Sequence, residues 1–548
     1  MKGRKPLALP RSAISLNKIE DWLLKCSSLH NHLQMSAVMP TRLLRYEERS
    51  QEVFLCDSIP SLVKYIALSH CWGSVQPFTL KSQTIKELRA GLPMGDLPQT
   101  FQDALWLSNK LRIPYLWIDS LCILQDDPAD WARESSLMCD VYGNAYLTIA
   151  ATRAENSSGG FLGPRSGPSD VTIPYRTNEI SSEVSACLLP NKFVANPSRV
   201  INMEDAPLSR RAWVLQERYL SPRTLHFTET QTFFECDLCF IAEDGDCTQE
   251  HPFEGEYAIG LSSVQEDKVE RMRGWRLIVE RYTRRSLTAD DDKLPAIAGL
   301  STRFALKGKS KEGQVMFNSS YLAGLWKEDF LRDMCWEIDY YYPLGGASST
   351  YIAPSWSWTS VKSAIDYAAH WFGTIEDLAI VQGIGVDLDN TENAFGRVTG
   401  GWVHLSVIKL RPYQKDGKHF LWFREDEAIF RVTVTWDSAR YGLPDYDHLG
   451  ESIDHKDLVA ILLGWTKRHI DGLDTPDALT GPFFLIVMPA QTDTSVINKS
   501  APRYQRVGLG LALGLPNQEL DKVGVTKLIQ ERFMREKEGG RLEDVVIL

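Results

Sequence analysis

Short apolar runs alternate with amphipathic stretches between residues 61 and 245 of the chain. Five of these runs predict buried strands, because each is short, rich in branched or aromatic side chains, and bounded by turn residues. They cover residues 63–69, 115–118, 146–151, 224–227 and 232–236. The spacing between the runs leaves room for helices.

Helical periodicity predicts helices between these strands, over residues 100–108, 127–143 and 208–219. In the second of them, Asp127 can cap the helix and Pro128 suits the first helical position. Strands that alternate with helices of this length favour right-handed parallel βαβ units. We therefore predict an α/β domain with an open, mostly parallel sheet and helices on both faces.

The pattern changes on either side of this predicted domain, which we place at residues 61–245. Residues 1–60 mix short helical stretches with turns and resemble an N-terminal arm. Residues 246–345 are mainly a helical segment. Residues 346–548 contain β-favouring runs separated by turn residues, which predict an antiparallel, β-rich C-terminal domain.

Composition narrows the possible partners. The formal net charge of −11 gives no global attraction to phosphate backbones, so we expect no nucleic acid partner. No stretch approaches the roughly 20 apolar residues that a membrane span requires. The N-terminus lacks the apolar core of a signal peptide, and the ten cysteines form no tight framework. We expect a soluble, cytoplasmic protein with free thiols.

Two groups of residues have the composition of metal ligands. They are Cys236 and Cys239 with Cys247 and His251, and the acids Asp126, Asp127 and Asp130. The first group lacks the spacing of a four-ligand zinc site and is better explained as the buried end of a strand. Helix capping explains the acids. We therefore predict no metal site.

Three segments, in order along the chain, carry a family resemblance. They read YIALSHCWG at 65–73, YLWIDSLCILQDD at 115–127 and RAWVLQE at 211–217. Together they resemble the three blocks of fungal heterokaryon incompatibility (HET) domains, over about residues 60–240. Fragments at 293–300, 323–326 and 353–358 are similar to segments that accompany the domain in many relatives, and no function is assigned to them.

This resemblance implies a role in vegetative incompatibility, the allorecognition that triggers programmed cell death when different fungal cells fuse. HET domains also look distantly like Toll/interleukin-receptor (TIR) domains, which share the flavodoxin-like β/α order. Some TIR domains hydrolyse NAD with a glutamate on a helix after the third strand, and Glu217 occupies the comparable place. The resemblance implies NAD as a substrate and no resident cofactor.

Residues that directly follow parallel strands, together with the third block, supply a candidate substrate site, since ligands bind beyond the carboxyl ends of such strands. The candidate binding residues are Ser69, His70, Trp72, Gly73, Asp119, Arg211 and Trp213. In this interpretation Trp72 stacks on a ring and Asp119 binds ribose hydroxyls. Glu217 is the catalytic candidate, because an anion near the ribose stabilises an oxocarbenium-like transition state. Trp213 and Glu217 are four residues apart and share a helix face, with Arg210 one turn earlier.

Other readings of the same residues stay open. Glu217 can simply neutralise the neighbouring arginines, and the tryptophans can belong to the core. Cys122 with His70 allows thiol catalysis. The domain can also be a non-enzymatic signalling module that self-associates or recruits an incompatibility partner protein.

Overall fold

A computed structural model describes most of the chain, which divides into two compact units. The first comprises Met1–Leu261 with Ala296–Arg303, and the second comprises Ser262–Pro295 with Phe304–Leu548. The described residues are 6–32, 38–57, 59, 63–73, 78–165, 170–176, 181–187, 203–245, 247–248, 268–307, 320–339, 341–342, 351–367, 374–416, 420–425, 428–437, 454–467, 481–490, 501–511 and 531–548. No helix within these ranges has both the length and the apolar character for crossing a bilayer.

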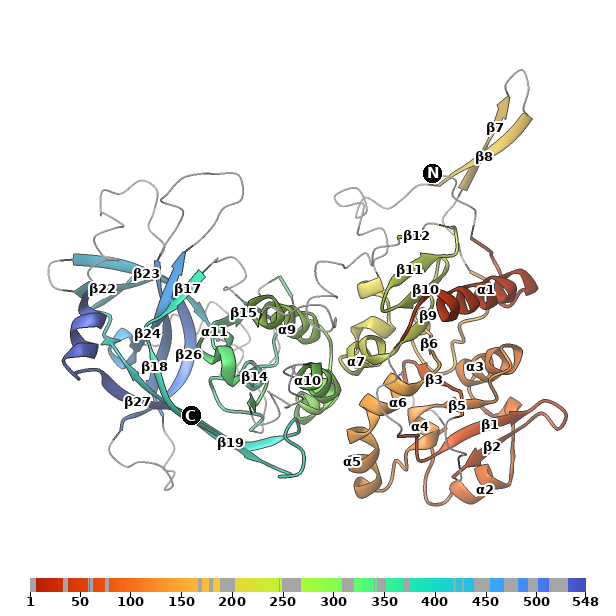
Figure 1. Cartoon of the computed structure of the whole chain (residues 1–548), viewed down its shortest axis with the longest axis horizontal. Coiled ribbons are helices and arrows are strands. Elements are labelled where there is room, and N and C mark those ends of the chain that lie inside the picture. The colour runs from red at the N-terminus through yellow and green to blue at the C-terminus, as the bar shows by residue number, and fades with distance from the viewer. Residues whose placement is uncertain are drawn as a thin grey trace. The chain divides into compact units, whose positions relative to one another are not determined.

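Ten strands of the described residues form one sheet in the first unit, in the order β12-β11-β10-β9-β6-β3-β5-β1-β2-β4 (Figure 1). The four central strands are parallel: β9 (Arg223–Phe227), β6 (Leu147–Ala150), β3 (Tyr65–Ser69) and β5 (Tyr115–Trp117). The flanking strands are β1 (Leu43–Glu47), β2 (Glu52–Cys56), β4 (Leu92–Pro93), β10 (Thr232–Cys236), β11 (Cys239–Ala242) and β12 (Cys247–Thr248). All six pairings that involve these flanking strands are antiparallel.

The α/β class is confirmed, but the sheet is mixed, and the predicted open, mostly parallel sheet is not confirmed. The physical reason lies in the connections. β10 follows β9 after the turn at 228–231, and only Asp237 and Leu238 separate β10 from β11. Such short turns can join only antiparallel neighbours.

The five predicted strands correspond to β3, β5, β6, β9 and β10, with ends that agree to within two residues. Every residue of β3 and β10 is buried, as expected for strands inside a sheet. Residues before 61, expected to be an arm, contain helix α1 (Ala13–Leu29) and also supply β1 and β2 to the sheet.

The three helices predicted over 100–108, 127–143 and 208–219 are present with two differences, and the unit has further helices that were not predicted. Besides α1, the unit contains α2 (Ile85–Ala90), α3 (Gln99–Lys110), α4 (Asp119–Cys122), α5 (Pro128–Ser136), α6 (Met138–Asn144) and α7 (Trp213–Leu220). The helix predicted over 127–143 is divided at Leu137 into α5 and α6. The helix predicted to begin at 208 begins at Trp213, because Arg211 adopts an extended conformation.

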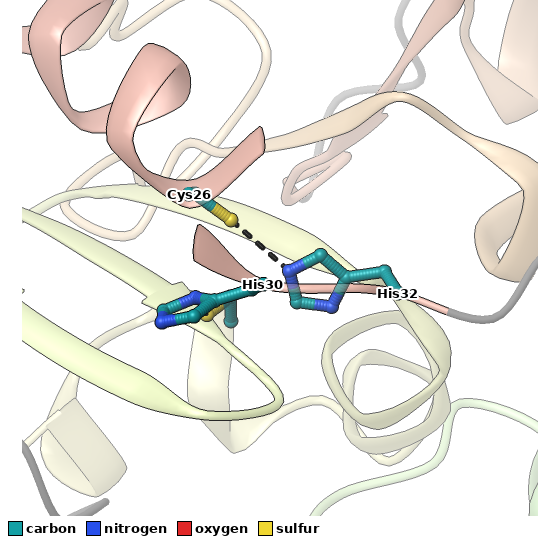
Figure 2. Close-up of side chains that lie close together, drawn as sticks. Cys26, His30 and His32 are labelled. Atoms are coloured by element: carbon teal, nitrogen blue, oxygen red, sulfur yellow. Dashed lines mark hydrogen bonds between the residues drawn. The ribbon is translucent and has the colours of Figure 1, made fainter. Parts of the chain in front are cut away.

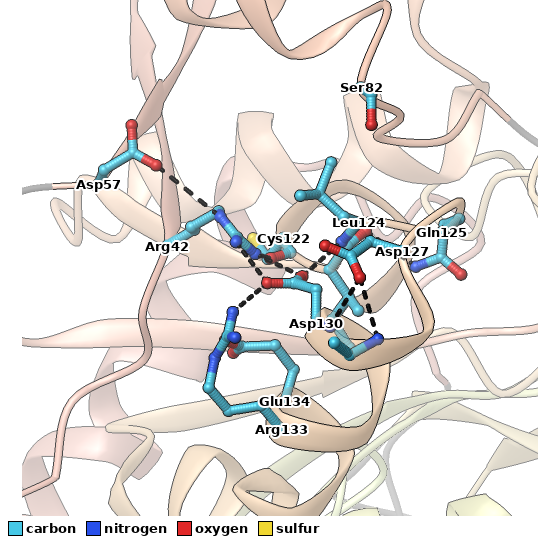
Figure 3. A network of polar contacts seen from close by, with 12 residues as sticks. Arg42, Asp57, Ser82, Cys122, Leu124, Gln125, Asp127, Asp130, Arg133 and Glu134 are labelled. Carbon is cyan, nitrogen blue, oxygen red and sulfur yellow. Dashed lines mark hydrogen bonds and ion pairs between the residues drawn. The ribbon is translucent and has the colours of Figure 1, made fainter.

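A buried ion pair fixes the start of α5 (Figure 3). The predicted cap is confirmed, since Asp127 accepts hydrogen bonds from the backbone N–H groups of Ala129 and Asp130. The Arg42 guanidinium donates to both carboxylate oxygens of Asp130, at 2.9 and 2.7 Å, and to the Cys122 carbonyl at 2.8 Å. Of the three acids that resembled metal ligands, Asp127 thus caps α5, Asp130 anchors it to the segment before β1, and Asp126 accepts hydrogen bonds from the Ser82 backbone N–H.

In the second unit, eleven strands of the described residues form a β-rich sheet (Figure 1). They are β17 (Thr374–Asp377), β18 (Ile380–Leu388), β19 (Val398–Val407), β20 (Lys409–Leu410), β21 (Gln414–Asp416), β22 (Phe420–Glu425), β23 (Ala428–Trp436), β24 (Val459–Lys467), β25 (Gly481–Pro489), β26 (Arg503–Leu511) and β27 (Glu543–Ile547). Among these described strands, β26 and β27 pair in parallel, and every other pairing is antiparallel. The predicted β-rich C-terminal region is therefore confirmed.

A buried aromatic cluster joins two of the fragments that had no assigned role. It contains Trp275 of α9 (Lys268–Thr283), Trp326 and Trp358, each of which is fully buried. The indole N–H groups of Trp275 and Trp358 both donate to the Gly324 carbonyl, at 3.2 and 3.0 Å. The fragments 323–326 and 353–358 thus form one piece of core.

Candidate functional site

The candidate site lies where the parallel strands β3 and β5 end. Ser69 is the last residue of β3, and His70 follows it directly. Asp119 begins α4, two residues after β5. Glu217 is on α7, and its carboxyl group interacts with the side chain of Ser69 and with the charge of Asp119. The structure therefore brings together the acid and the strand ends that the sequence analysis combined.

Glu217 is a buried acid that retains a proton more readily than an ordinary glutamate. Glu217 is only 4% exposed to solvent. Burial raises the pKa of Glu217 from 4.5 to about 7, and the Asp119 carboxylate adds to the rise. The Arg211 guanidinium and the hydroxyl groups of Ser69 and Tyr142 act in the opposite direction. A carboxyl with a pKa near neutrality can both accept and donate a proton.

Two buried polar atoms at this site lack a hydrogen-bond partner of standard geometry. Among the described residues, they are Oε2 of Glu217 itself and Oγ of the neighbouring Ser69. The Ser69 hydroxyl is near enough to lower the Glu217 pKa, so the two groups are close without a well-formed hydrogen bond. Buried polar atoms without partners are rare and often mark functional sites.

His70 is held as a neutral imidazole. Burial lowers the pKa of His70 to about 4, and the Arg211 charge lowers it further, while Asp119 opposes the change. The Nδ1 atom lies 3.7 Å from Asp119 Oδ1, and Nε2 is a third buried atom without a partner in the described part of the chain. The ring contacts Phe101 edge-on at a centroid distance of 5.0 Å. A neutral His70 can donate or accept a hydrogen bond but carries no charge at neutral pH.

Asp119 positions the predicted stacking residue. Its Oδ2 atom accepts a 2.9 Å hydrogen bond from the indole N–H of Trp72, and its Oδ1 atom accepts one of 2.7 Å from the Ser120 backbone. Trp72 itself is half-buried. Asp119 therefore orients the Trp72 ring. If Asp119 also bound ribose hydroxyls, the ribose would have to use carboxylate oxygens that already accept these two hydrogen bonds.

Of the remaining predicted residues, Gly73 follows Trp72 in the chain, Arg211 contacts His70, and Trp213 packs against Trp131 of α5. Gly73 has a φ of +84°, and a Cβ there would lie 2.3 Å from the Cβ of Asn156, so only glycine fits this turn. Arg211 donates a hydrogen bond to the His70 carbonyl. Trp213, half-buried at the start of α7, contacts the Trp131 ring edge-on at 6.4 Å.

Three expectations about this site need correction or narrowing. Arg210 is in a separate 3₁₀ turn, Leu208–Arg210, and does not share the face of α7. Arg218 pairs with Glu235 at 2.8 Å and does not neutralise Glu217. Burial raises the pKa of Cys122 to about 12, which disfavours the thiolate that thiol catalysis requires.

Sequence reasoning missed one contributor to the site. Tyr142, on α6, is fully buried and donates a 3.3 Å hydrogen bond to the Leu68 carbonyl. Its hydroxyl also interacts with the Glu217 carboxyl. Its position on the buried face of the predicted helix was visible in the sequence, but that pattern is equally typical of a core tyrosine.

These features define an α/β domain with a buried acid at the carboxyl edge of its parallel strands. Residues 65–217 match the family model described as Heterokaryon incompatibility protein (HET), so this part of the chain is a HET domain. The match begins at the first residue of β3 and ends at Glu217. Comparisons with curated proteins and with solved structures gave no match.

Proposed function

We propose that the HET domain hydrolyses NAD and that this activity triggers cell death in heterokaryon incompatibility. The observation that supports the proposal best is the Glu217 carboxyl, which is buried, has a pKa of about 7 and lies beside Ser69 and Asp119. Perturbed acids of this kind concentrate at catalytic sites. The strand-end position is also where open α/β sheets bind ligands.

The proposed reaction breaks the bond between the nicotinamide nitrogen and the ribose C1′ atom. Nicotinamide leaves with the electron pair of that bond, and positive charge develops on the ribose. The Glu217 carboxylate stabilises this charge and then accepts a proton from the water that adds to C1′. The products are nicotinamide, ADP-ribose and a proton, and Trp72 provides a ring face for stacking.

The test is release of nicotinamide from NAD by the purified full chain. Glu217→Gln preserves the shape of the side chain and removes its charge, so we expect at least a 100-fold loss of rate, on the order of a removed general acid or base. Glu134→Gln is the matched control, because Glu134 is a buried glutamate of the same domain whose carboxylate lies 3.3 Å from Arg133. Equal rates for wild type and Glu217→Gln would refute the catalytic role.

The same burial favours a second candidate function, a non-enzymatic signalling module. Glu217 and His70 are 4% and 2% exposed, so a substrate can reach them only after a rearrangement. In this alternative the HET domain acts in the cytoplasm by associating with further copies or with an incompatibility partner protein. Toxicity in cells that survives Glu217→Gln, with NAD levels unchanged, would favour the module over the enzyme.

A further inference from the structure

Four potential metal ligands from distant parts of the sequence meet at one end of helix α1. They are Cys26 in its last turn, His30 at its C-cap, His32 and Cys236, the last residue of β10. Their ligand atoms all lie within 4.8 Å of one another. Figure 2 shows Cys26 and His32 joined by a contact, with the His30 ring beside them.

The distances fit a tetrahedral ion. Cys26 Sγ lies 3.0 Å from His32 Nε2, and Cys236 Sγ lies 3.3 Å from His30 Nδ1. In a zinc site with Zn–S near 2.3 Å and Zn–N near 2.0 Å, neighbouring ligand atoms are separated by about 3.4–3.8 Å. A small outward movement of each side chain would therefore accommodate the ion. We propose that Cys26, His30, His32 and Cys236 bind a structural zinc ion.

Local backbone geometry explains why these residues converge. The chain leaves α1 at His30 with φ −116° and ψ 131°, an extended conformation. Residues two apart in an extended segment project to the same side, so His30 and His32 can approach the ion together. Cys236 is provided by the tight β10–β11 hairpin, in which Cys236 pairs with Cys239 across a two-residue turn.

The residues around the four ligands have the character of an outer shell. Asp237 Oδ2 lies 3.5 Å from His32 Nδ1, the ring nitrogen that would face away from the ion. A carboxylate in this position orients a ligating imidazole and increases its basicity. The Arg223 Nε–H donates to Cys26 Sγ at 3.3 Å and so helps to hold this side chain in place.

A four-ligand site leaves no open position for a substrate, so its role would be structural. The ion would attach α1 to β10, where Trp22 already contacts Phe234 at a ring distance of 6.3 Å. The proposed zinc site is independent of NAD hydrolysis. A competing explanation is a set of free thiols and imidazoles, or a disulfide between Cys236 and Cys239, whose sulfurs are 3.4 Å apart.

The experiment measures metal content in the purified full chain, reconstituted with zinc under reducing conditions and passed through a desalting column. We expect about one zinc ion per chain in the wild type and a loss of at least tenfold in Cys26→Ser and in Cys236→Ser. Cys56→Ser is the matched control, because Cys56 is a free cysteine of β2 in the same unit. Asp237→Asn should retain the ion with an affinity lowered by about 10–100-fold.

A second measurement covers the case in which the cysteine variants fail to fold. Cobalt(II) added to the wild type should give tetrahedral ligand-field bands and a thiolate-to-metal charge-transfer band. The proposal is overturned if the wild type retains no zinc and shows no cobalt bands. It is also overturned if both cysteine variants keep zinc at the wild-type ratio, or if mass spectrometry finds Cys236 and Cys239 joined in a disulfide after reconstitution.

Discussion

The buried Glu217 carboxyl should make the stability of the HET domain depend on pH in a defined direction. Its pKa rises from 4.5 to about 7 in the folded protein because burial penalises the charged form. The folded state therefore holds this proton more tightly than the unfolded state. The resulting stabilisation is fully present below about pH 4.5 and is lost as the pH rises through 7.

The magnitude follows from the shift. The pKa rises by 2.5, from 4.5 to 7, and a rise of one corresponds to about 1.36 kcal/mol, which gives about 3 kcal/mol. In Glu217→Gln the side chain cannot ionise. The free energy of unfolding of this variant, relative to wild type, should therefore increase by about 3 kcal/mol between pH 4.5 and 8 and then remain constant.

Hydrogen exchange of peptides from β3 and α7 provides the assay, because it reports on this unit separately from the rest of the chain. His70 has a lowered pKa of about 4 and titrates in both proteins, so its contribution largely cancels in the comparison. Glu134→Gln, which replaces a buried glutamate paired with Arg133, is measured alongside as the control for the substitution itself. The reasoning is refuted if Glu217→Gln loses stability relative to wild type as the pH rises, or if the difference does not change.

Two further substitutions test the packing. Arg506→Met should destabilise the second unit by about 3–5 kcal/mol, because it removes the counter-ion of the fully buried Asp437, which lies 2.7 Å from Arg506 Nε in the wild type. A loss of stability below about 1 kcal/mol in urea unfolding would contradict this reasoning. Gly73→Ala should lower the free energy of unfolding by about 1–3 kcal/mol, since the φ of +84° and the contact with Asn156 both oppose a side chain. Gly95→Ala is the control, because nothing lies within 4 Å of the new Cβ, and it should change the melting temperature little. Equal effects of the two glycine substitutions would argue against the turn geometry.

Much of the HET domain fold was predictable from local pattern. The five strands were found because each buried run is short and bounded by turn residues. The cap of α5 was also predictable, because Asp127 and Pro128 act on the helix that they begin. These features depend on neighbours in sequence, which a single chain reveals directly.

Features that depend on distant residues were not predictable in this way. β1 joins the central sheet because Leu44 and Arg45 pair with β5, and β2 joins it by pairing with β1. No local pattern encodes the pairing of β1 with β5. The helix predicted over 208–219 is interrupted at Arg211, which has an extended backbone. The Arg211 side chain donates to the carbonyl of His70, a residue far away in the sequence. Among the proposed zinc ligands, Cys26, His30 and His32 lie in one short segment, whereas Cys236 is 206 residues after His30. The pair Cys236 and Cys239 alone therefore gave no sign of Cys26.

The Gly324 carbonyl limits which substitutions the core of the second unit can accept. One peptide oxygen accepts from two indoles that belong to separate segments, Trp275 and Trp358, and a Cβ at Gly324 would lie 2.7 Å from the second indole nitrogen. Neither tryptophan can be exchanged for a residue lacking an N–H without leaving the shared acceptor with fewer donors. A substitution in the segment 323–326 should therefore be tolerated only with a matching change in the segment 353–358, because both segments pack around one peptide group.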